Sequence, residues 1–128
     1  MPTPAATRPG GAILEPLDLA RQIVEIIADK KGEDILLLDI QELSILTDYF
    51  VIASVNSERQ AKAVADEIRQ QIKKTSDIRP LYTDNDPATG WILLDYADVI
   101  VHLFAPETRA YYDLETLWRD GKIVVRML

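Results

Sequence analysis

The sequence predicts one α/β domain of the α+β type, in which helices pack on a mixed five-stranded sheet in the order αββαβββα. Three observations support this fold class. Short aliphatic and aromatic runs alternate with longer segments whose apolar residues recur at helical spacing. Two of the short runs, within Trp91 to Phe104, meet at a tight-turn signal. The 128 residues are 48% hydrophobic and 27% charged, which suits a single domain with a core.

The chain should begin with a tail and a helix. Residues 1 to 14 hold few bulky apolar side chains, so we expect them to be disordered, ahead of one domain over residues 15 to 120. A helix should run from about Pro16 to Lys31, because proline suits the first turn and lysine the last, and Gly32 follows. Its buried stripe is Leu17, Ala20, Ile23, Val24, Ile27 and Ala28.

Two strands and a second helix should follow. The uninterrupted aliphatic run within Asp34 to Ile40 indicates a central strand covered on both faces. Asp48 to Ser54 is aromatic and β-branched, and the short connection before it favours antiparallel pairing. Ser57 to Gln60 has the form of a capping box, so it should begin a helix that ends near Lys74. The buried stripe of that helix is Ala61, Val64, Ala65, Ile68 and Ile72.

The remaining elements are a parallel strand, a loop, a hairpin and a third helix. A strand at about Ile78 to Tyr82 should lie parallel to the second strand after a right-handed crossover. Thr83 to Gly90 consists of turn formers and predicts a surface loop. A helix should start at Pro106, carry Tyr111, Leu114, Leu117 and Trp118, and end at Arg119-Asp-Gly121. In the extension over residues 121 to 128, the alternating run predicts either a small edge strand or a partner contact.

The hairpin within Trp91 to Phe104 should turn at Tyr96 and Ala97. With a two-residue loop, the facing pairs are Asp95 with Asp98, Leu93 with Ile100, and Trp91 with His102. One face carries Ile92, Leu94, Val99, Val101 and Leu103, and should pack on a core. The other carries Trp91, Leu93, Asp95, Asp98, Ile100, His102 and Phe104. A three-residue loop would exchange the two faces of the second strand.

The second face of this hairpin permits two interpretations. Large apolar groups beside two carboxylates are typical of a surface kept for a partner. In the other interpretation, Trp91 and Phe104 lie under a helix and the carboxylates sit in water at the strand ends.

Composition narrows the classes of function. No apolar run approaches the ~20 residues that span a bilayer and no signal peptide is apparent, so we expect a cytoplasmic protein without a membrane partner. With no cysteine and one histidine, the chain lacks thiolate chemistry and the usual zinc ligands, and we expect no cofactor. The net charge of -7 predicts little direct RNA contact and favours a basic protein partner.

Three stretches together resemble one known family. They are Thr47-Asp-Tyr-Phe-Val-Ile52, the hairpin sequence Trp91-Ile-Leu-Leu-Asp-Tyr96 with Asp98-Val-Ile-Val-His102, and Arg109-Ala-Tyr-Tyr-Asp-Leu-Glu-Thr-Leu-Trp118. In order and spacing they resemble the ribosomal silencing factors, also called the Iojap or RsfS family, over roughly Leu17 to Asp120. Where the family usually has Asp-Tyr-Gly-Asp, this chain has Asp95-Tyr-Ala-Asp98.

The resemblance implies a nucleotidyltransferase-like fold used without catalysis. It implies binding to the large ribosomal subunit through its fourteenth large-subunit protein, L fourteen, on the face where the small subunit joins. A protein at that place blocks joining and represses translation when nutrients fall, and organellar relatives of the family act in large-subunit biogenesis.

The resemblance also locates a partner-binding site on the hairpin. It suggests Trp91 and Leu93 as apolar anchors, Asp95 and Asp98 as partners for basic groups, and Tyr96 and His102 as hydrogen-bonding flanks. For His102, a hydrogen bond within the fold is the competing role. A secondary contact is expected at Arg109 and Tyr111. For these two residues and for Trp118, helical spacing favours packing between helix and sheet.

Two other functions compete with this interpretation. An active nucleotidyltransferase would need paired carboxylates for Mg²⁺, but Asp84-Asn-Asp86 lies in a loop without a Gly-Ser turn, and Asp34 and Asp39 should point to opposite faces of their strand. A hydrolase would have to use His102, and no G-x-S-x-G motif is present. Alternatively, the second face of the predicted hairpin pairs two copies of the free chain as a homodimer.

Overall fold

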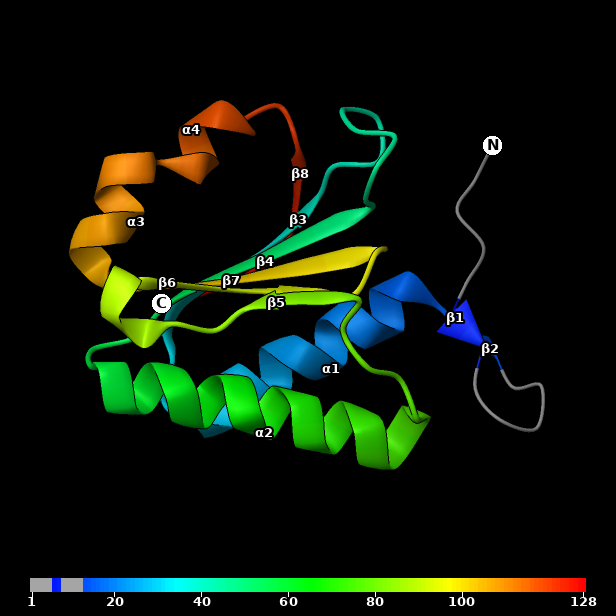
Figure 1. The fold of residues 1–128 in the computed structure, drawn as a ribbon. Helices are drawn as coiled ribbons and strands as arrows, with labels where there is room; N and C mark the ends of the chain where they lie inside the picture. The colour runs from blue at the N-terminus through cyan, green and yellow to red at the C-terminus, as the bar shows by residue number, and fades with distance from the viewer. Residues whose placement is uncertain (1–5, 8–12) are drawn as a thin grey trace.

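The computed structural model describes residues 6–7 and 13–128, and a six-stranded mixed sheet forms its body (Figure 1). The helices are α1 (Pro16–Asp29), α2 (Glu58–Ser76), α3 (Pro106–Tyr112) and α4 (Leu114–Leu117), with one 3-10 turn, η1 (Pro87–Thr89). The strands of the main sheet are β3 (Glu33–Asp39), β4 (Tyr49–Ser54), β5 (Tyr82–Asp84), β6 (Trp91–Asp95), β7 (Val99–Phe104) and β8 (Lys122–Met127). The predicted α+β class is confirmed, with one strand more than expected.

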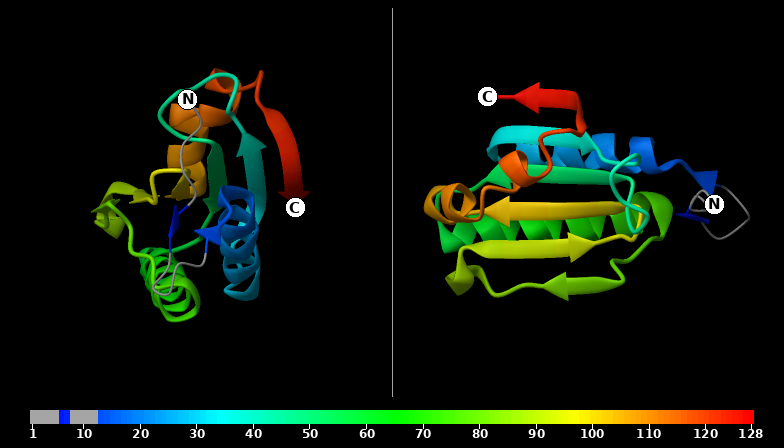
Figure 2. Two further views of the ribbon diagram at one scale, coloured as in Figure 1. Left: turned by 90° about the vertical axis from the view of Figure 1, so that its right-hand side faces the viewer. Right: turned by 90° about the horizontal axis from the view of Figure 1, so that it is seen from above.

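The order of strands across the sheet is β5-β6-β7-β4-β3-β8, which Figure 2 shows from above. Only β4 and β7 run parallel; every other neighbouring pair in this sheet is antiparallel. The predicted antiparallel pairing of β3 with β4 is confirmed, and Leu37 lies opposite Val51. Since β8 pairs with β3, residues 122–127 form an edge strand of this sheet.

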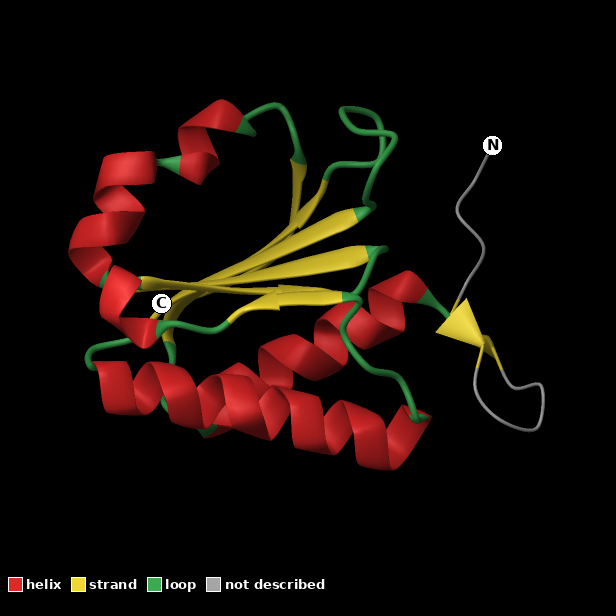
Figure 3. Ribbon diagram, in the orientation of Figure 1, coloured by secondary structure: helices red, strands yellow, loops and turns green. Residues whose placement is uncertain are grey.

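Helices cover the two faces of the sheet unequally (Figure 3). Both long helices, α1 and α2, lie along one face, whereas α3 and α4 stand at one end of the other. The first face forms the larger core with residues such as Ile23, Val51 and Ile68. The second forms a smaller cluster of Leu36, Leu38, Ile40, Phe50, Ile52 and Phe104, with Leu114 and Trp118 packed against it. β3 and β4 are therefore covered on both faces, as the aliphatic run of β3 predicts.

The predicted cap of α2 is confirmed in its main contact. Ser57 Oγ accepts a hydrogen bond from the Gln60 backbone N–H at 3.0 Å. The Gln60 side chain does not return to Ser57; its Oε1 accepts from the Asn56 N–H at 2.7 Å. Its Nε2 donates to the carbonyl groups of Lys30 and Lys31, so the cap also joins the start of α2 to the end of α1.

The predicted strand at Ile78 to Tyr82 is wrong in its bounds and in its place in the sheet, although its predicted direction, parallel to β4, is right. The strand there, β5, starts only at Tyr82, lies at the sheet edge and is antiparallel to β6. Pro80 interrupts the earlier residues because it has no N–H to donate to a ladder. The position beside β4 is taken by β7, whose buried apolar run fits a sheet interior better.

The third helix is shorter than predicted because it is broken. Asp113 has φ +49° and both ends α3 and precedes α4. Aspartate tolerates this left-handed conformation better than most residues, and its N–H still donates to the carbonyl of Arg109. Helical periodicity continues through the break in the sequence, so the pattern alone predicts one helix.

Most of the predicted tail over residues 1 to 14 lies outside the described residues. The described part includes a short antiparallel pair, β1 (Ala6–Thr7) with β2 (Ile13–Leu14), which the sequence prediction did not contain.

The hairpin turns one residue later than predicted. The Tyr96 N–H donates to the Val99 carbonyl and the Asp98 N–H to the Tyr96 carbonyl, which places Ala97 and Asp98 in the loop. The facing pairs are therefore Trp91 with Phe104, Leu93 with His102, and Asp95 with Ile100. The three predicted pairs are wrong. The predicted faces are right, because the register moves by an even number of residues and does not exchange them.

We predict that Ala97→Gly stabilises the protein. Ala97 has φ +70°, in the left-handed region that L side chains disfavour and glycine accepts. The free energy of unfolding should rise by about 1 kcal/mol, measured by urea denaturation. As a matched control, Ala110→Gly at an exposed position of α3 should lower it by about 1 kcal/mol. Equal losses at both positions would contradict the strain argument.

Candidate functional site

The centre of the candidate site is Trp91, at the start of β6 on the second face of the sheet. Its ring lies 4.9 Å from Phe104 and 4.7 Å from Tyr112 at the end of α3, centroid to centroid. The indole Nε1–H donates to His102 Nδ1 at 3.2 Å. Trp91 is thus half-buried, held from below by the sheet and from one side by α3.

His102 is the buried anchor of this tryptophan. It is 4% exposed and its ring meets Phe50 edge-to-face at a centroid distance of 4.8 Å. Burial lowers the pKa of His102 to about 4, because the charged ring would lose its hydration. The ring is therefore neutral at pH 7, and acceptance at Nδ1 assigns its proton to Nε2. The competing role considered for His102, a hydrogen bond within the fold, is the one that the geometry provides.

Arg109 joins α3 to the sheet. This side chain is buried, and its Nη1 donates to the carbonyl of Asp34 at 2.7 Å and to Ser54 Oγ at 2.9 Å. Its Nε donates to the Glu115 carboxylate at 2.8 Å, across the break at Asp113. Arg109 therefore has the packing role that helical spacing favours, and it fixes the position of Tyr112 three residues later.

An exposed surface surrounds Trp91 where α3 and α4 leave the sheet uncovered. Because opposite residues share a face, β5 places Tyr82 beside Asp95, and Asp84 beside Leu93. We call this surface the hairpin face: Tyr82, Asp84, Trp91, Leu93, Asp95 and Tyr112. It contains a hollow of about 290 Å³ lined by Asp84, Thr89, Trp91, Leu93 and Tyr112.

The hairpin face combines apolar area with negative charge. Tyr82 is 60% exposed and Tyr112 is 50% exposed, whereas Trp91 and Leu93 are half-buried. Its two charged members are both aspartates. Such a surface suits noncovalent docking of a partner that offers apolar groups flanked by basic ones.

The structure divides the six residues predicted for partner binding into two groups. Trp91, Leu93 and Asp95 lie half-buried on the hairpin face. Tyr96, Asp98 and His102 are 5%, 4% and 4% exposed, so their side chains offer almost no surface to a partner of the folded chain. Asp95 also has a role within the fold, since its Oδ1 accepts from the Ala97 N–H at 2.7 Å and holds the turn.

The two enclosed residues of the turn, Tyr96 and Asp98, are perturbed by burial. Burial raises the pKa of Tyr96 to about 12. It also raises the pKa of Asp98, with the negative charge of Asp48 as a second cause. Within residues 6–7 and 13–128, Tyr96 Oη and Asp98 Oδ1 have no hydrogen-bond partner. The resemblance implied that both side chains contact a partner, but the Asp98 carbonyl accepts from the N–H groups of Asp48 and Tyr49 and draws the turn against β4.

Of the predicted secondary contacts, Tyr111 is 82% exposed and Arg109 is enclosed. Sequence reasoning missed Tyr82, Asp84 and Tyr112. The aromatic pair Tyr111-Tyr112 was a usable signal for Tyr112, but nothing in the sequence places β5 beside β6 in the observed register.

Two kinds of feature, a metal-binding cluster and a membrane-spanning helix, are not found in the described residues. Within residues 6–7 and 13–128, no group of three His, Cys, Asp or Glu side chains lies together in a way that could hold a metal ion. No helix in the same part of the chain is both long and apolar enough to cross a membrane.

Comparisons with known proteins agree on one family. The sequence profile described as "Ribosomal silencing factor during starvation" matches residues 14–127. The chain is similar to the ribosomal silencing factor RsfS of Bacillus subtilis, at 40% identity over 74% of this chain and 80% of the relative. It is 30% identical to the mouse protein named "Mitochondrial assembly of ribosomal large subunit protein 1", over 75% of this chain and 43% of the relative.

A solved structure supports the same assignment. The crystal structure of a Chromobacterium violaceum protein superposes with a TM-score of 0.78 at 31% identity, and the match covers 88% of this chain and 94% of that one. Nearly the whole described fold is therefore shared with that protein.

We predict that His102 makes the stability depend on pH. Its folded pKa of about 4 lies below the unfolded value of 6.5, so the unfolded chain binds more protons between these values. Stability is full above pH 6.5 and falls as the pH falls toward 4, by about 3 kcal/mol from this group.

His102→Asn isolates that contribution, since asparagine Oδ1 can accept from Trp91 and does not titrate in this range. Both free energies of unfolding are measured in urea between pH 7 and pH 4. As the pH is lowered, the value for the wild type should fall steadily relative to the value for the variant. A difference that stays constant with pH would show that folding does not lower the pKa of His102.

Proposed function

The chain belongs to the family of ribosomal silencing factors, and on that premise we propose that it represses translation by binding the large ribosomal subunit. We propose L fourteen as the protein contacted and the hairpin face as the surface that contacts it. The bound chain then blocks joining of the small subunit by occupying its place, under nutrient limitation.

The observation that carries this proposal is the composition of the hairpin face. Aromatic side chains that are exposed next to a well-supported tryptophan are the usual anchors of protein interfaces. Asp84 and Asp95 flank them, so a basic protein surface is complementary and an RNA backbone is not. The net charge of -7 acts in the same direction over longer range, because it steers the chain away from phosphate.

A role in large-subunit biogenesis is a compatible second proposal. Its support is the name of the mouse relative, a mitochondrial protein of large-subunit assembly. Binding to the subunit is common to both roles, so the same face would serve each.

A catalytic nucleotidyltransferase has less support. The carboxylates that would have to bind Mg²⁺ in such an enzyme, Asp84 and Asp86, are exposed. In addition, Asp86 Oδ1 accepts from the Ala88 N–H and caps η1. Calorimetry with nucleoside triphosphates and Mg²⁺ tests the rival directly, and heat of turnover would favour it.

We predict that Trp91→Ala weakens binding to purified large subunits at least about tenfold, because it removes the aromatic anchor. Asp84→Lys should also weaken binding, by reversing a charge on an exposed side chain without disturbing the core. The measurement is co-sedimentation at one fixed salt concentration, with folding of each variant verified by circular dichroism.

Glu25→Lys is the matched control. Glu25 is exposed on α1, which lies against the opposite face of the sheet, and the variant carries the same change of charge as Asp84→Lys. It should bind like wild type. If wild type binds and all variants bind equally, the docking surface lies elsewhere, and Tyr111→Ala then tests α3. If wild-type protein does not reduce joining of small to large subunits in a sucrose gradient, repression by steric block is wrong.

A further inference from the structure

A second hollow lies on the other side of Trp91, at the carboxyl ends of the two parallel strands. β4 leads into α2 on one face of the sheet, and β7 leads into α3 on the opposite face. The crevice where neighbouring parallel strands send their helices to opposite faces is the preferred ligand position in open α/β sheets. In this chain that crevice is a cavity of about 310 Å³.

The floor of this cavity is apolar. Val55, Ile92 and Leu103 line it and are at most 2% exposed. Trp91 belongs to the lining of both this cavity and the hollow on the hairpin face. A volume at the lower end of the range for ligand pockets, roughly 300 to 1,000 Å³, suits a long side chain.

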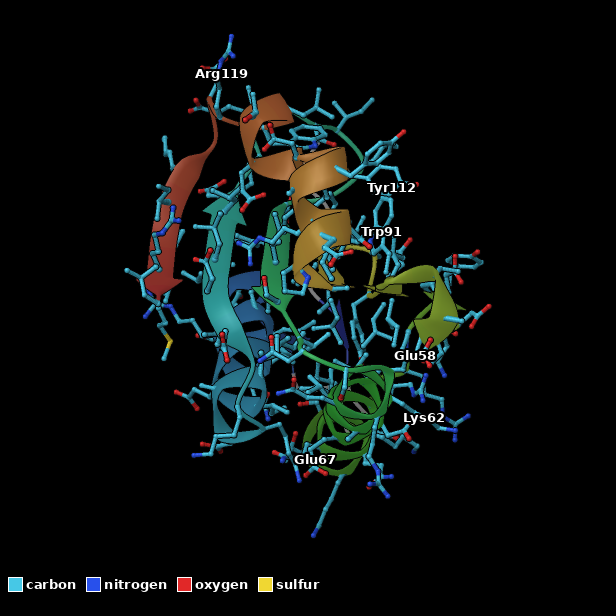
Figure 4. All side chains as sticks on the ribbon, turned by 90° about the vertical axis from the view of Figure 1, so that its left-hand side faces the viewer. Glu58, Lys62, Glu67, Trp91, Tyr112 and Arg119 are labelled. Atoms are coloured by element: carbon cyan, nitrogen blue, oxygen red, sulfur yellow. The ribbon has the colours of Figure 1, made fainter. Side chains whose placement is uncertain are left out.

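The charged groups that line the cavity are both acidic. Glu58 comes from the first turn of α2 and Glu107 from the first turn of α3, and both are exposed. Figure 4 looks at this end of the molecule and shows Glu58 near the start of α2, below Trp91 and Tyr112. The basic residues Arg59 and Lys62 line a neighbouring hollow, which shares Glu58 and Pro87 with this cavity.

We propose that this cavity accepts an arginine side chain of the protein partner, an inference that rests on the proposed function and deepens it. An apolar floor fits the methylene stem of arginine. Two carboxylates at the mouth supply the opposite charge. An anionic ligand would instead meet Glu58 and Glu107. The partner therefore straddles Trp91, with apolar groups on the hairpin face and one arginine beyond it.

The test compares two doubly substituted chains that change the net charge equally. Glu58→Gln with Glu107→Gln neutralises the mouth of the cavity. Glu25→Gln with Asp29→Asn neutralises two exposed positions on α1 as the matched control. Each chain is immobilised, and the association and dissociation rates of purified large subunits are measured by interferometry.

We expect the cavity variant to bind about tenfold more weakly, mainly through faster dissociation, while the control matches wild type. A loss confined to the association rate would indicate long-range steering and overturn the proposal. Equal binding by all three chains would overturn it and leave the proposed function intact. If wild type itself does not bind, the proposed function fails, and this proposal fails with it.

Discussion

The buried guanidinium of Arg109 joins the short helices α3 and α4 to the sheet. Arg109 bonds to the end of β4 through Ser54, to the start of β3 through the Asp34 carbonyl, and to α4 through Glu115. Without these contacts, the short helices α3 and α4 would depend on a few apolar contacts at one end of the sheet. Tyr112 sits at the end of α3 and packs on Trp91. The shape of the hairpin face therefore depends on the contacts that Arg109 makes.

Trp91 is the point at which the fold and the proposed function meet. Its lower side is fixed by a neutral histidine, which remains neutral because burial disfavours its charged form. Trp91 also lines two hollows of similar size, one on the hairpin face and one at the ends of β4 and β7. An aromatic side chain that the fold holds in place, with acidic residues in the lining of both hollows, presents a preorganised surface, which reduces the entropy lost when a partner binds.

Much of the fold could be predicted from local patterns. The helix that begins at Pro16, the cap at Ser57 and the antiparallel pair of β3 with β4 follow from periodicity, capping chemistry and connection length. The resemblance of three stretches to ribosomal silencing factors was confirmed by the family match over residues 14–127. The two faces of the hairpin were also right, because the turn moved by one residue and so shifted the register by two, which leaves each side chain on its face.

The sequence by itself determined the class of fold, the family and the acidic character of the chain. Only the tertiary structure decided which predicted site residues are exposed. Tyr96 and Asp98 are enclosed because backbone bonds from Asp48 and Tyr49 draw their turn against β4, a contact between segments some fifty residues apart. Long-range packing likewise decides the strand order, the break at Asp113 and the cavity beside Trp91. Periodicity within one segment does not predict any of these features.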